Sequence, residues 1–383
     1  MAKDLIFWCG QRDSNSHGIF PTWPSTKPVY QFQHGRLCGR LSECQLYFKL
    51  IKLIMDFTSE VKKATSSIYQ KISKTMPEIE WSIHAPYIYE INKLKKEKNA
   101  VILAHNYQTP EIYHGISDFS ADSLALAIEA AKTKAEKIVM CGVHFMAETA
   151  KLMSPNKKVL LPDLKAGCSL SSSITGTDVR ELKRKNPGVP VVSYVNTSAD
   201  VKAETDVCCT SANAVKIVNS LGVKKVIFLP DDYLAKYVAS QTDVEIISWR
   251  GTCEVDEQFT DTEINEIRQN NPGIKVIAHP ECPPEVIKAS DFAGSTSGMI
   301  KYVRDNQPKK VMMVTECSMS DNIQIDNPNV EFIRPCNLCP HMKRITLPKI
   351  LDCLKNETNE IVMSKDIIER ARKSVERMAE IGR

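Results

Sequence analysis

The sequence predicts an α/β protein made of three αβα sandwich domains, each with a short parallel sheet, related by a pseudo-threefold axis. Two observations lead to this prediction. Short runs rich in Val and Ile, bounded by Asn, Pro, Gly or Asp, alternate with helical stretches, as buried strands of a parallel sheet do. Several features also recur three times in the same order, which indicates an internal repeat.

The repeat rests on residue types at matching positions. An Asp is followed five residues later by a hydroxyl residue, and fourteen residues after that by a lysine that opens an apolar run. The three sets are Asp118, Ser123 and Lys137; Asp206, Ser211 and Lys225; and Asp291, Thr296 and Lys310. Each unit is expected to run strand, short helix, short strand, helix, strand, helix, strand, with right-handed crossovers.

The repeat also predicts the domain boundaries. A helical segment over residues 55–99 is expected to precede the units. Unit one covers residues 100–168 and is completed by C-terminal helices in 345–383, unit two covers 169–253, and unit three covers 254–344.

Residues 1–54 differ from the rest of the chain. They lack apolar periodicity, and their three cysteines have no partner pattern. We expect this segment to be disordered, or a spurious extension with Met55 as the true start. A targeting peptide is the alternative, which its acidic residues and prolines disfavour.

Composition excludes several classes of protein. The 383 residues are 43% hydrophobic and 25% charged, as in an ordinary globular protein. A net charge of +4 with dispersed lysines argues against a nucleic-acid partner. No apolar run approaches the roughly 18–20 residues that cross a membrane. Thirteen cysteines without a convincing secretory signal favour a metal centre in a reducing cytoplasm over a disulfide framework.

Three cysteines share one phase of the repeat. Cys168, Cys253 and Cys339 each come nine residues after a valine that opens an apolar run, in turn-forming surroundings. A threefold axis would bring their thiolates together, which suits a [4Fe–4S] cluster with one open iron or a catalytic zinc. The lack of histidine in the set favours the cluster. Cys336 forms a C-x-x-C with Cys339, so either could be the ligand, and repeat phase favours Cys339.

Other polar residues recur at the expected carboxyl ends of strands, where parallel sheets bind ligands. Ser123, Ser211 and Thr296 each begin a predicted helix as its N-cap, and three such helix ends would form anion sockets. The first strand of each unit is followed by ionisable or hydrogen-bonding side chains. These are His105 and Tyr107, then Tyr194 and Asn196, then His279 and Glu281. Glu281 is the candidate general base, with His105, His279 and Tyr107 as proton donors or orienting groups.

These segments resemble the quinolinate synthase family. The resemblance rests on Ala104-His-Asn-Tyr-Gln-Thr-Pro-Glu111, Gly142-Val-His-Phe-Met-Ala-Glu-Thr-Ala-Lys151, Tyr194-Val-Asn-Thr-Ser198, Thr210-Ser-Ala-Asn213, His279-Pro-Glu281 and Ser295-Thr-Ser297. It runs from about residue 80 to the C-terminus and covers none of residues 1–54.

The resemblance implies an oxygen-sensitive [4Fe–4S] transferase of NAD biosynthesis in the cytoplasm. Such an enzyme condenses iminoaspartate (iminosuccinate) with dihydroxyacetone phosphate to quinolinate, releasing phosphate and water. The implied partners are iron–sulfur assembly proteins and, transiently, the L-aspartate oxidase that supplies iminoaspartate. The cluster ligands fall on Cys168, Cys253 and Cys339. The substrate-binding positions fall on His105, Ser123, Tyr194, Asn196, Ser211, His279, Glu281 and Thr296, and Tyr107 is a catalytic candidate.

One departure concerns the last cysteine loop. Some relatives carry three closely spaced cysteines there, whereas this chain has only Cys336 and Cys339, which puts a thiol switch in this loop in doubt. Two other functions stay open. A cluster-dependent hydratase or dehydratase of another small carboxylic acid would use the same groups. A non-enzymatic redox or iron sensor would not need the converging His, Tyr, Glu and hydroxyl residues.

The first prediction concerns residues 1–54. A chain that starts at Met55 should retain the cluster and the activity of the full chain, because the missing segment has no apolar pattern with which to pack on the repeats. Iron and sulfide analysis and an activity assay of both chains would check this. Loss of either property in the shorter chain would show that the segment belongs to the fold.

Overall fold

The computed structural model describes residues 56–382, so the prediction for residues 1–54 lies outside the described part. Helices α2 (Ser59–Ile72) and α3 (Glu78–Glu97) come first, within the segment predicted to be helical. Pro77 precedes α3 with an extended backbone, and Glu78 and Glu80 lie in its first turn, where negative charge is favourable.

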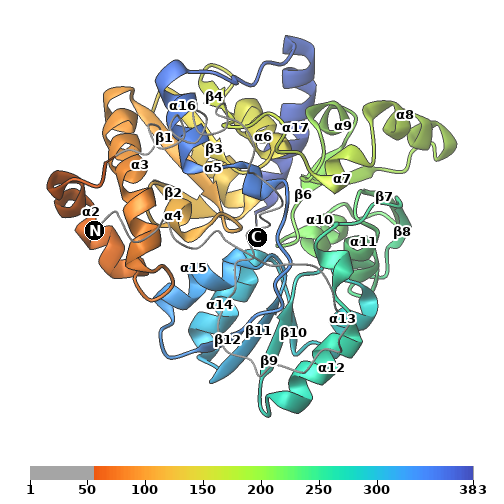
Figure 1. The fold of residues 1–383 in the computed structure, drawn as a ribbon. Helices are drawn as coiled ribbons and strands as arrows, with labels where there is room; N and C mark the ends of the chain where they lie inside the picture. Colours follow the sequence, from red (N-terminus) through yellow and green to blue (C-terminus); the bar gives the residue numbers. More distant parts are fainter. Residues whose placement is uncertain (1–55, 383) are drawn as a thin grey trace, which may run out of the picture. The chain divides into compact units, whose positions relative to one another are not determined.

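Three four-stranded sheets follow, and every strand pair in them is parallel (Figure 1). The strand orders are β2-β1-β3-β4, β6-β5-β7-β8 and β10-β9-β11-β12, so the same topology occurs three times. The α/β fold with three αβα units that the sequence predicted is confirmed, including the order of elements within each unit.

The bounds of the elements repeat in the same way. The first set, a sheet with the helices between its strands, comprises β1 (Ala100–His105), α4 (Pro110–Tyr113), β2 (Phe119–Ala121), α5 (Ser123–Lys132), β3 (Lys137–Cys141), α6 (His144–Met153) and β4 (Lys158–Leu160). The second comprises β5 (Val191–Tyr194), α9 (Ala199–Ala203), β6 (Val207–Cys209), α10 (Ala214–Ser220), β7 (Lys225–Leu229), α11 (Asp232–Ala239) and β8 (Glu245–Ser248). The third comprises β9 (Lys275–Ala278), α13 (Pro284–Ala289), β10 (Phe292–Ala293), α14 (Thr296–Asn306), β11 (Lys310–Val314), α15 (Ser318–Asp326) and β12 (Glu331–Ile333).

Short connections and a C-terminal pair of helices complete the described chain. They are α7 (Ser169–Ser172), α8 (Gly176–Lys185), η1 (Asp256–Gln258), α12 (Asp261–Asn270), η2 (Met342–Arg344), α16 (Leu347–Asn356) and α17 (Lys365–Ile381).

The third sheet illustrates why apolar runs become central strands here. Val276 and Ala278 face one core cluster, together with Val286 of α13. Ile277, between them in sequence, faces another cluster, together with Met299 of α14. Successive side chains of a strand point to opposite faces, so a strand covered by helices on both faces must be apolar at every position.

The repeated aspartates tie the first strand of each unit to the second. Asp118 accepts a hydrogen bond from the backbone N–H of Ile102 at 2.8 Å. Asp206 accepts from Val191 N–H at 2.7 Å, and Asp291 from Val276 N–H at 2.9 Å. The same side chain therefore satisfies a backbone donor at the same place in all three sheets, which explains why an Asp recurs there.

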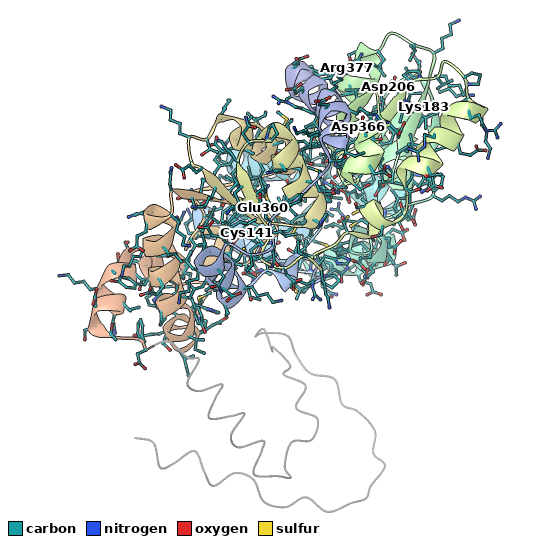
Figure 2. The ribbon with its side chains drawn as sticks, turned by 90° about the horizontal axis from the view of Figure 1, so that it is seen from above. Cys141, Lys183, Asp206, Glu360, Asp366 and Arg377 are labelled. Carbon is teal, nitrogen blue, oxygen red and sulfur yellow. A yellow bond between two sulfur atoms is a disulfide. The ribbon has the colours of Figure 1, made fainter. Side chains whose placement is uncertain are left out.

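Helix α17 packs against elements of both the first and the second unit. It contacts α6 on one side and α9 and β6 on the other. Figure 2 labels Asp366 and Arg377 on α17 and Lys183 and Asp206 on the second unit, and Arg377 donates to the Asp206 carbonyl at 3.4 Å. Helix α16 packs on α3 and β3 of the first unit.

The cysteines of residues 56–382 divide into three kinds. Cys141, Cys208, Cys209, Cys282 and Cys353 are buried free thiols. Cys168, Cys253 and Cys339 are free and half-buried. Cys317 and Cys336 form a disulfide with a Cα–Cα distance of 5.0 Å, a pairing that the sequence analysis did not foresee. Within residues 56–382, no helix has the length and apolarity to cross a membrane.

Candidate active site and metal centre

The loops that follow the strands of the three sheets line one cavity of about 70 Å³. That is several times the roughly 10–15 Å³ that one water needs, so the cavity can admit a small ligand. The described residues that line it include every site residue that the sequence singled out: His105, Tyr107, Ser123, Cys168, Tyr194, Asn196, Ser211, Cys253, His279, Glu281, Thr296 and Cys339.

The same backbone hydrogen bond holds each of the three cysteine loops. In each unit, an N–H just after the third strand donates to the carbonyl two residues before the cysteine. The pairs are His144 N to Ala166 O at 2.7 Å, Asp232 N to Gly251 O at 2.9 Å, and Cys317 N to Asn337 O at 3.0 Å. Because this bond recurs, the three thiols occupy equivalent positions at the ends of the three sheets. Position in the repeat had favoured Cys339 over Cys336 for the same reason.

The cysteine loops also contact one another. The Ser169 hydroxyl, next to Cys168, donates to the Thr252 carbonyl at 3.0 Å and accepts from the Glu254 N–H at 3.1 Å. It therefore bonds to the residues on both sides of Cys253. His341 Nε2, two residues after Cys339, lies 2.9 Å from Glu254 Oε1. The three loops form one connected structure around the thiols.

The donor set fits a bound metal group. Burial raises the pKa of Cys168 to about 12 and of Cys339 to about 11, and it also raises the pKa of Cys253. Three such thiols would be protonated at neutral pH unless a cation offset the cost of their charge, as coordination does. Cys336 lies in a disulfide, which leaves Cys339 as the thiol of its C-x-x-C that lines the cavity.

The spacing of the thiols bears on which metal group they suit. Among residues 56–382, the group of His, Cys, Asp and Glu ligand atoms that lies within 4.8 Å of one another is Cys253, Asp256 and Glu281. The three cysteines do not form such a group. A single zinc bound at about 2.3 Å by three sulfurs would need them closer than that.

A chain of polar contacts joins the second and third units beside the thiols. The Tyr194 hydroxyl donates to Glu281 Oε1. His279 Nδ1 lies 3.4 Å from the same carboxylate oxygen, and His279 Nε2 lies 3.0 Å from the Ser211 hydroxyl. Burial raises the pKa of Glu281, although the neighbouring His279 opposes the shift. A carboxylate with a raised pKa is a better base near neutral pH.

His105 and Tyr107 approach the cavity from the first unit. Burial lowers the pKa of His105 to about 3, so its imidazole is neutral at physiological pH. The Tyr107 N–H donates to His105 Nδ1 at 3.3 Å, which leaves the ring proton on Nε2. The Tyr107 hydroxyl lies 2.6 Å from the Thr315 hydroxyl, and burial raises the Tyr107 pKa well above its usual value.

The predicted helix caps need a correction of one or two residues. The N-cap of α5 is Asp122, and that of α14 is Ser295, so Ser123 and Thr296 are instead the first residues of their helices. Ser211 lies two residues before Asn213, the N-cap of α10. Asp122 and Ser295 are short polar residues that accept from the third residue of their helices, Asp122 from the Ala125 N–H at 3.0 Å and Ser295 from the Gly298 N–H at 3.2 Å. Ser123 and Thr296 are thus left to face the cavity.

Sequence reasoning missed several buried polar residues around the cavity. Asp256 lies three residues after Cys253 and lines the cavity, and burial raises its pKa to about 6. Thr315 and Glu316 follow β11, and Lys343 lies in η2. The signal for Glu316 was weak, because the matching position holds Val143 in unit one and the shorter carboxylate Asp231 in unit two, so no single residue type repeats there.

Comparison with known proteins now decides the family. Residues 89–380 match the family model described as quinolinate synthetase A protein. The chain belongs to this family. It is 58% identical to quinolinate synthase of Sinorhizobium fredii over 325 residues, which are 85% of this chain and 90% of that protein. It is 56% identical to quinolinate synthase of Caulobacter vibrioides over 329 residues, again 85% and 90%. Its identity to quinolinate synthase of Agrobacterium fabrum is 53% over 346 residues, 90% of this chain and 99% of that one.

Membership of the quinolinate synthetase A family confirms the family resemblance that the sequence motifs indicated. It also favours an enzyme over a non-enzymatic redox or iron sensor, since the relatives named above are all synthases.

Proposed function

We propose that the chain is a quinolinate synthase, a transferase that condenses iminoaspartate with dihydroxyacetone phosphate and releases phosphate and water. The observation that supports this most is the single cavity, in which three free thiols lie beside Tyr107, Tyr194, His279 and Glu281. Such a cavity combines metal ligands, acid–base groups and hydrogen-bond donors, as a condensation followed by dehydration requires.

We propose Cys168, Cys253 and Cys339 as the ligands of a [4Fe–4S] cluster with one iron free of protein ligands. When bound, the cluster supplies a Lewis acid toward an oxygen of the substrate. The thiols' free state and their place in one cavity support this assignment.

The acid–base work would fall to Glu281 and the groups around it. The raised pKa of Glu281 suits it to remove a proton at neutral pH. Tyr194 and His279 contact its carboxylate and would orient it. Neutral His105, with its proton on Nε2, would donate a hydrogen bond to a substrate oxygen rather than act as a cationic acid. Tyr107, which lines the same cavity, would hold or move a proton.

Substrate anions would bind at helix ends. Ser123 and Thr296 are the first residues of α5 and α14, helices of 10 and 11 residues, and both line the cavity. Free N–H groups at a helix N-terminus favour carboxylate or phosphate. Ser211 and Asn196 add hydrogen-bond donors from the second unit.

We expect the enzyme to act in the cytoplasm, because thiols that must accept a cluster stay free in a reducing compartment. Iron–sulfur assembly proteins would supply the cluster. A transient contact with the L-aspartate oxidase would limit the loss of iminoaspartate.

The decisive test of function is an anaerobic assay. Purified, cluster-loaded chain supplied with iminoaspartate and dihydroxyacetone phosphate should form quinolinate and release phosphate, both measured directly. A chain that converts other small acids by adding or removing water, but forms no quinolinate from this pair, would support the dehydratase alternative instead.

Substitution of the cysteines tests the metal ligands. Serine at Cys168, Cys253 or Cys339 should abolish the cluster, since a hard oxygen replaces a soft thiolate. The measurement is iron and sulfide content after anaerobic reconstitution. Cys336→Ser is the matched control in the same loop and should keep the cluster. Full cluster content in any of the first three variants would refute its assignment as a ligand.

Two further variants separate chemistry from binding. Glu281→Gln keeps the volume but removes the basic carboxylate, so kcat should fall by about 10²-fold or more with a normal cluster. Ser211→Ala removes a donor that contacts His279, so KM should rise more than kcat falls. Steady-state kinetics with iron analysis would check both. Wild-type turnover by Glu281→Gln would leave Glu281 as a positioning residue at most, with His105 or Tyr107 the better base candidate.

A further inference from the structure

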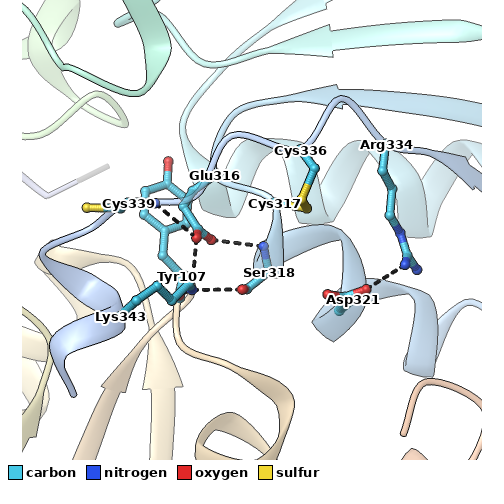
Figure 3. Close-up of a disulfide and its surroundings, with 9 residues drawn as sticks. All are labelled: Tyr107, Glu316, Cys317, Ser318, Asp321, Arg334, Cys336, Cys339 and Lys343. Atoms are coloured by element: carbon cyan, nitrogen blue, oxygen red, sulfur yellow. Dashed lines mark hydrogen bonds and ion pairs between the residues drawn. A yellow bond between two sulfur atoms is a disulfide. The ribbon is translucent and has the colours of Figure 1, made fainter. Parts of the chain in front are cut away.

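Lys343 uses all its hydrogen-bond donors within the protein. Its ammonium lies 2.7 Å from the Tyr107 carbonyl, 2.7 Å from the Ser318 hydroxyl and 2.8 Å from Glu316 Oε1 (Figure 3). A lysine ammonium has three N–H donors, and these contacts occupy all three. Lys343 is therefore not available to bind a substrate anion, although it lies four residues after Cys339.

Glu316 connects Lys343 to the loop of a proposed cluster ligand. Its side chain is 1% exposed. Oε1 accepts from the Cys339 N–H at 3.4 Å as well as from Lys343, and Oε2 accepts from the Ser318 N–H at 2.9 Å. Figure 3 shows these contacts converging on one carboxylate between Tyr107 and Cys339. The pair thus joins the loop after β1 in the first unit to the cysteine loop of the third.

Tyr107 is held at its other end as well. Its hydroxyl lies 2.6 Å from the hydroxyl of Thr315, the residue before Glu316. The turn after β11 therefore contacts both the backbone, through Lys343, and the side chain of Tyr107. A shift of this turn would move Tyr107 and Cys339 together.

The fold of a unit does not require this ion pair. The position that matches Glu316 is Val143 in the first unit and Asp231 in the second. Asp231 accepts from the Leu234 N–H at 2.6 Å as the N-cap of α11. Both of those units build the same turn and hold their cysteine loops through the same backbone bond. Burying an ion pair costs desolvation free energy, so a pair restricted to one unit calls for a reason other than folding.

We infer that Glu316 and Lys343 are positioning residues that keep Tyr107 and Cys339 in a fixed spatial relation. The inference rests on the proposed function, in which Tyr107 takes part in proton transfer and Cys339 binds the cluster. In this role they act through the Tyr107 backbone and the Cys339 N–H, and Glu316 also lines the cavity.

The test uses Lys343→Met, which keeps the stem of the side chain and removes its donors, and Glu316→Gln, which keeps the volume and removes the charge. The double variant avoids an unpaired buried charge where a single variant fails to fold. Lys225→Met is the control, because Lys225 pairs with Glu245 at 2.7 Å at the start of β7, at the other end of a sheet. Thermal unfolding and circular dichroism would verify folding.

Two measurements on full-length, cluster-loaded protein decide the matter. The first is the rate at which a chelator removes the cluster under anaerobic conditions, followed by the cluster's visible absorbance. The second is kcat and KM for quinolinate formation. We expect faster cluster loss, and a kcat lower by up to about 100-fold with KM changed by less than about threefold, as for a misplaced catalytic group. The control should match wild type in both.

A cycle with Tyr107→Phe distinguishes positioning from general structural damage. If Lys343 acts through Tyr107, Lys343→Met should lower kcat little further in the Tyr107→Phe background, because coupled residues are not additive. Fully multiplicative losses, or cluster loss and kcat equal to those of Lys225→Met, would overturn the inference. If the proposed function itself is wrong, the wild-type protein forms no quinolinate. The rate at which the chelator removes the cluster would still measure whether Glu316 and Lys343 hold Cys339 in place.

Discussion

The active cavity depends on one backbone hydrogen bond that occurs three times. In each unit, the N–H of the third residue after the third strand donates to a carbonyl two residues before a cysteine. That bond is possible because the fourth strand lies beside the third and delivers its following loop to the same end of the sheet. With this geometry repeated, three thiols 85 or so residues apart reach one cavity. Every other part of the candidate site is arranged around them.

The electrostatics of the site follow from its enclosure. Glu281, Asp256 and Glu316 are carboxylates buried within the same cavity lining, and burial raises the pKa of each. Neighbouring groups offset this cost at two of them: Tyr194 and His279 contact Glu281, and Lys343 pairs with Glu316. Because Tyr194 belongs to the second unit and Glu281 to the third, the environment of Glu281 depends on how these two units pack.

Local sequence signals predicted the elements well and their exact ends less well. Repeated Asp118, Asp206 and Asp291 indicated equivalent places, but only the structure showed that each accepts a backbone N–H of the first strand. The caps Asp122 and Ser295 lie one residue before the predicted ones, because both neighbouring residues are polar and sequence alone does not distinguish them. The domain boundaries placed at 168 and 253 stay predictions.

The sequence by itself determined the threefold repeat, the order of strands and helices, and many of the polar residues that meet at the cavity. It could do so because apolar periodicity is local and equal phase in a repeat becomes equal position in space. Tertiary structure alone decided the pairing of Cys317 with Cys336 and of Lys343 with Glu316 and Tyr107. These contacts join residues from different loops, are not repeated at the matching positions of the other units, and obey no period. Their partners are set by how the units pack, which no local pattern encodes.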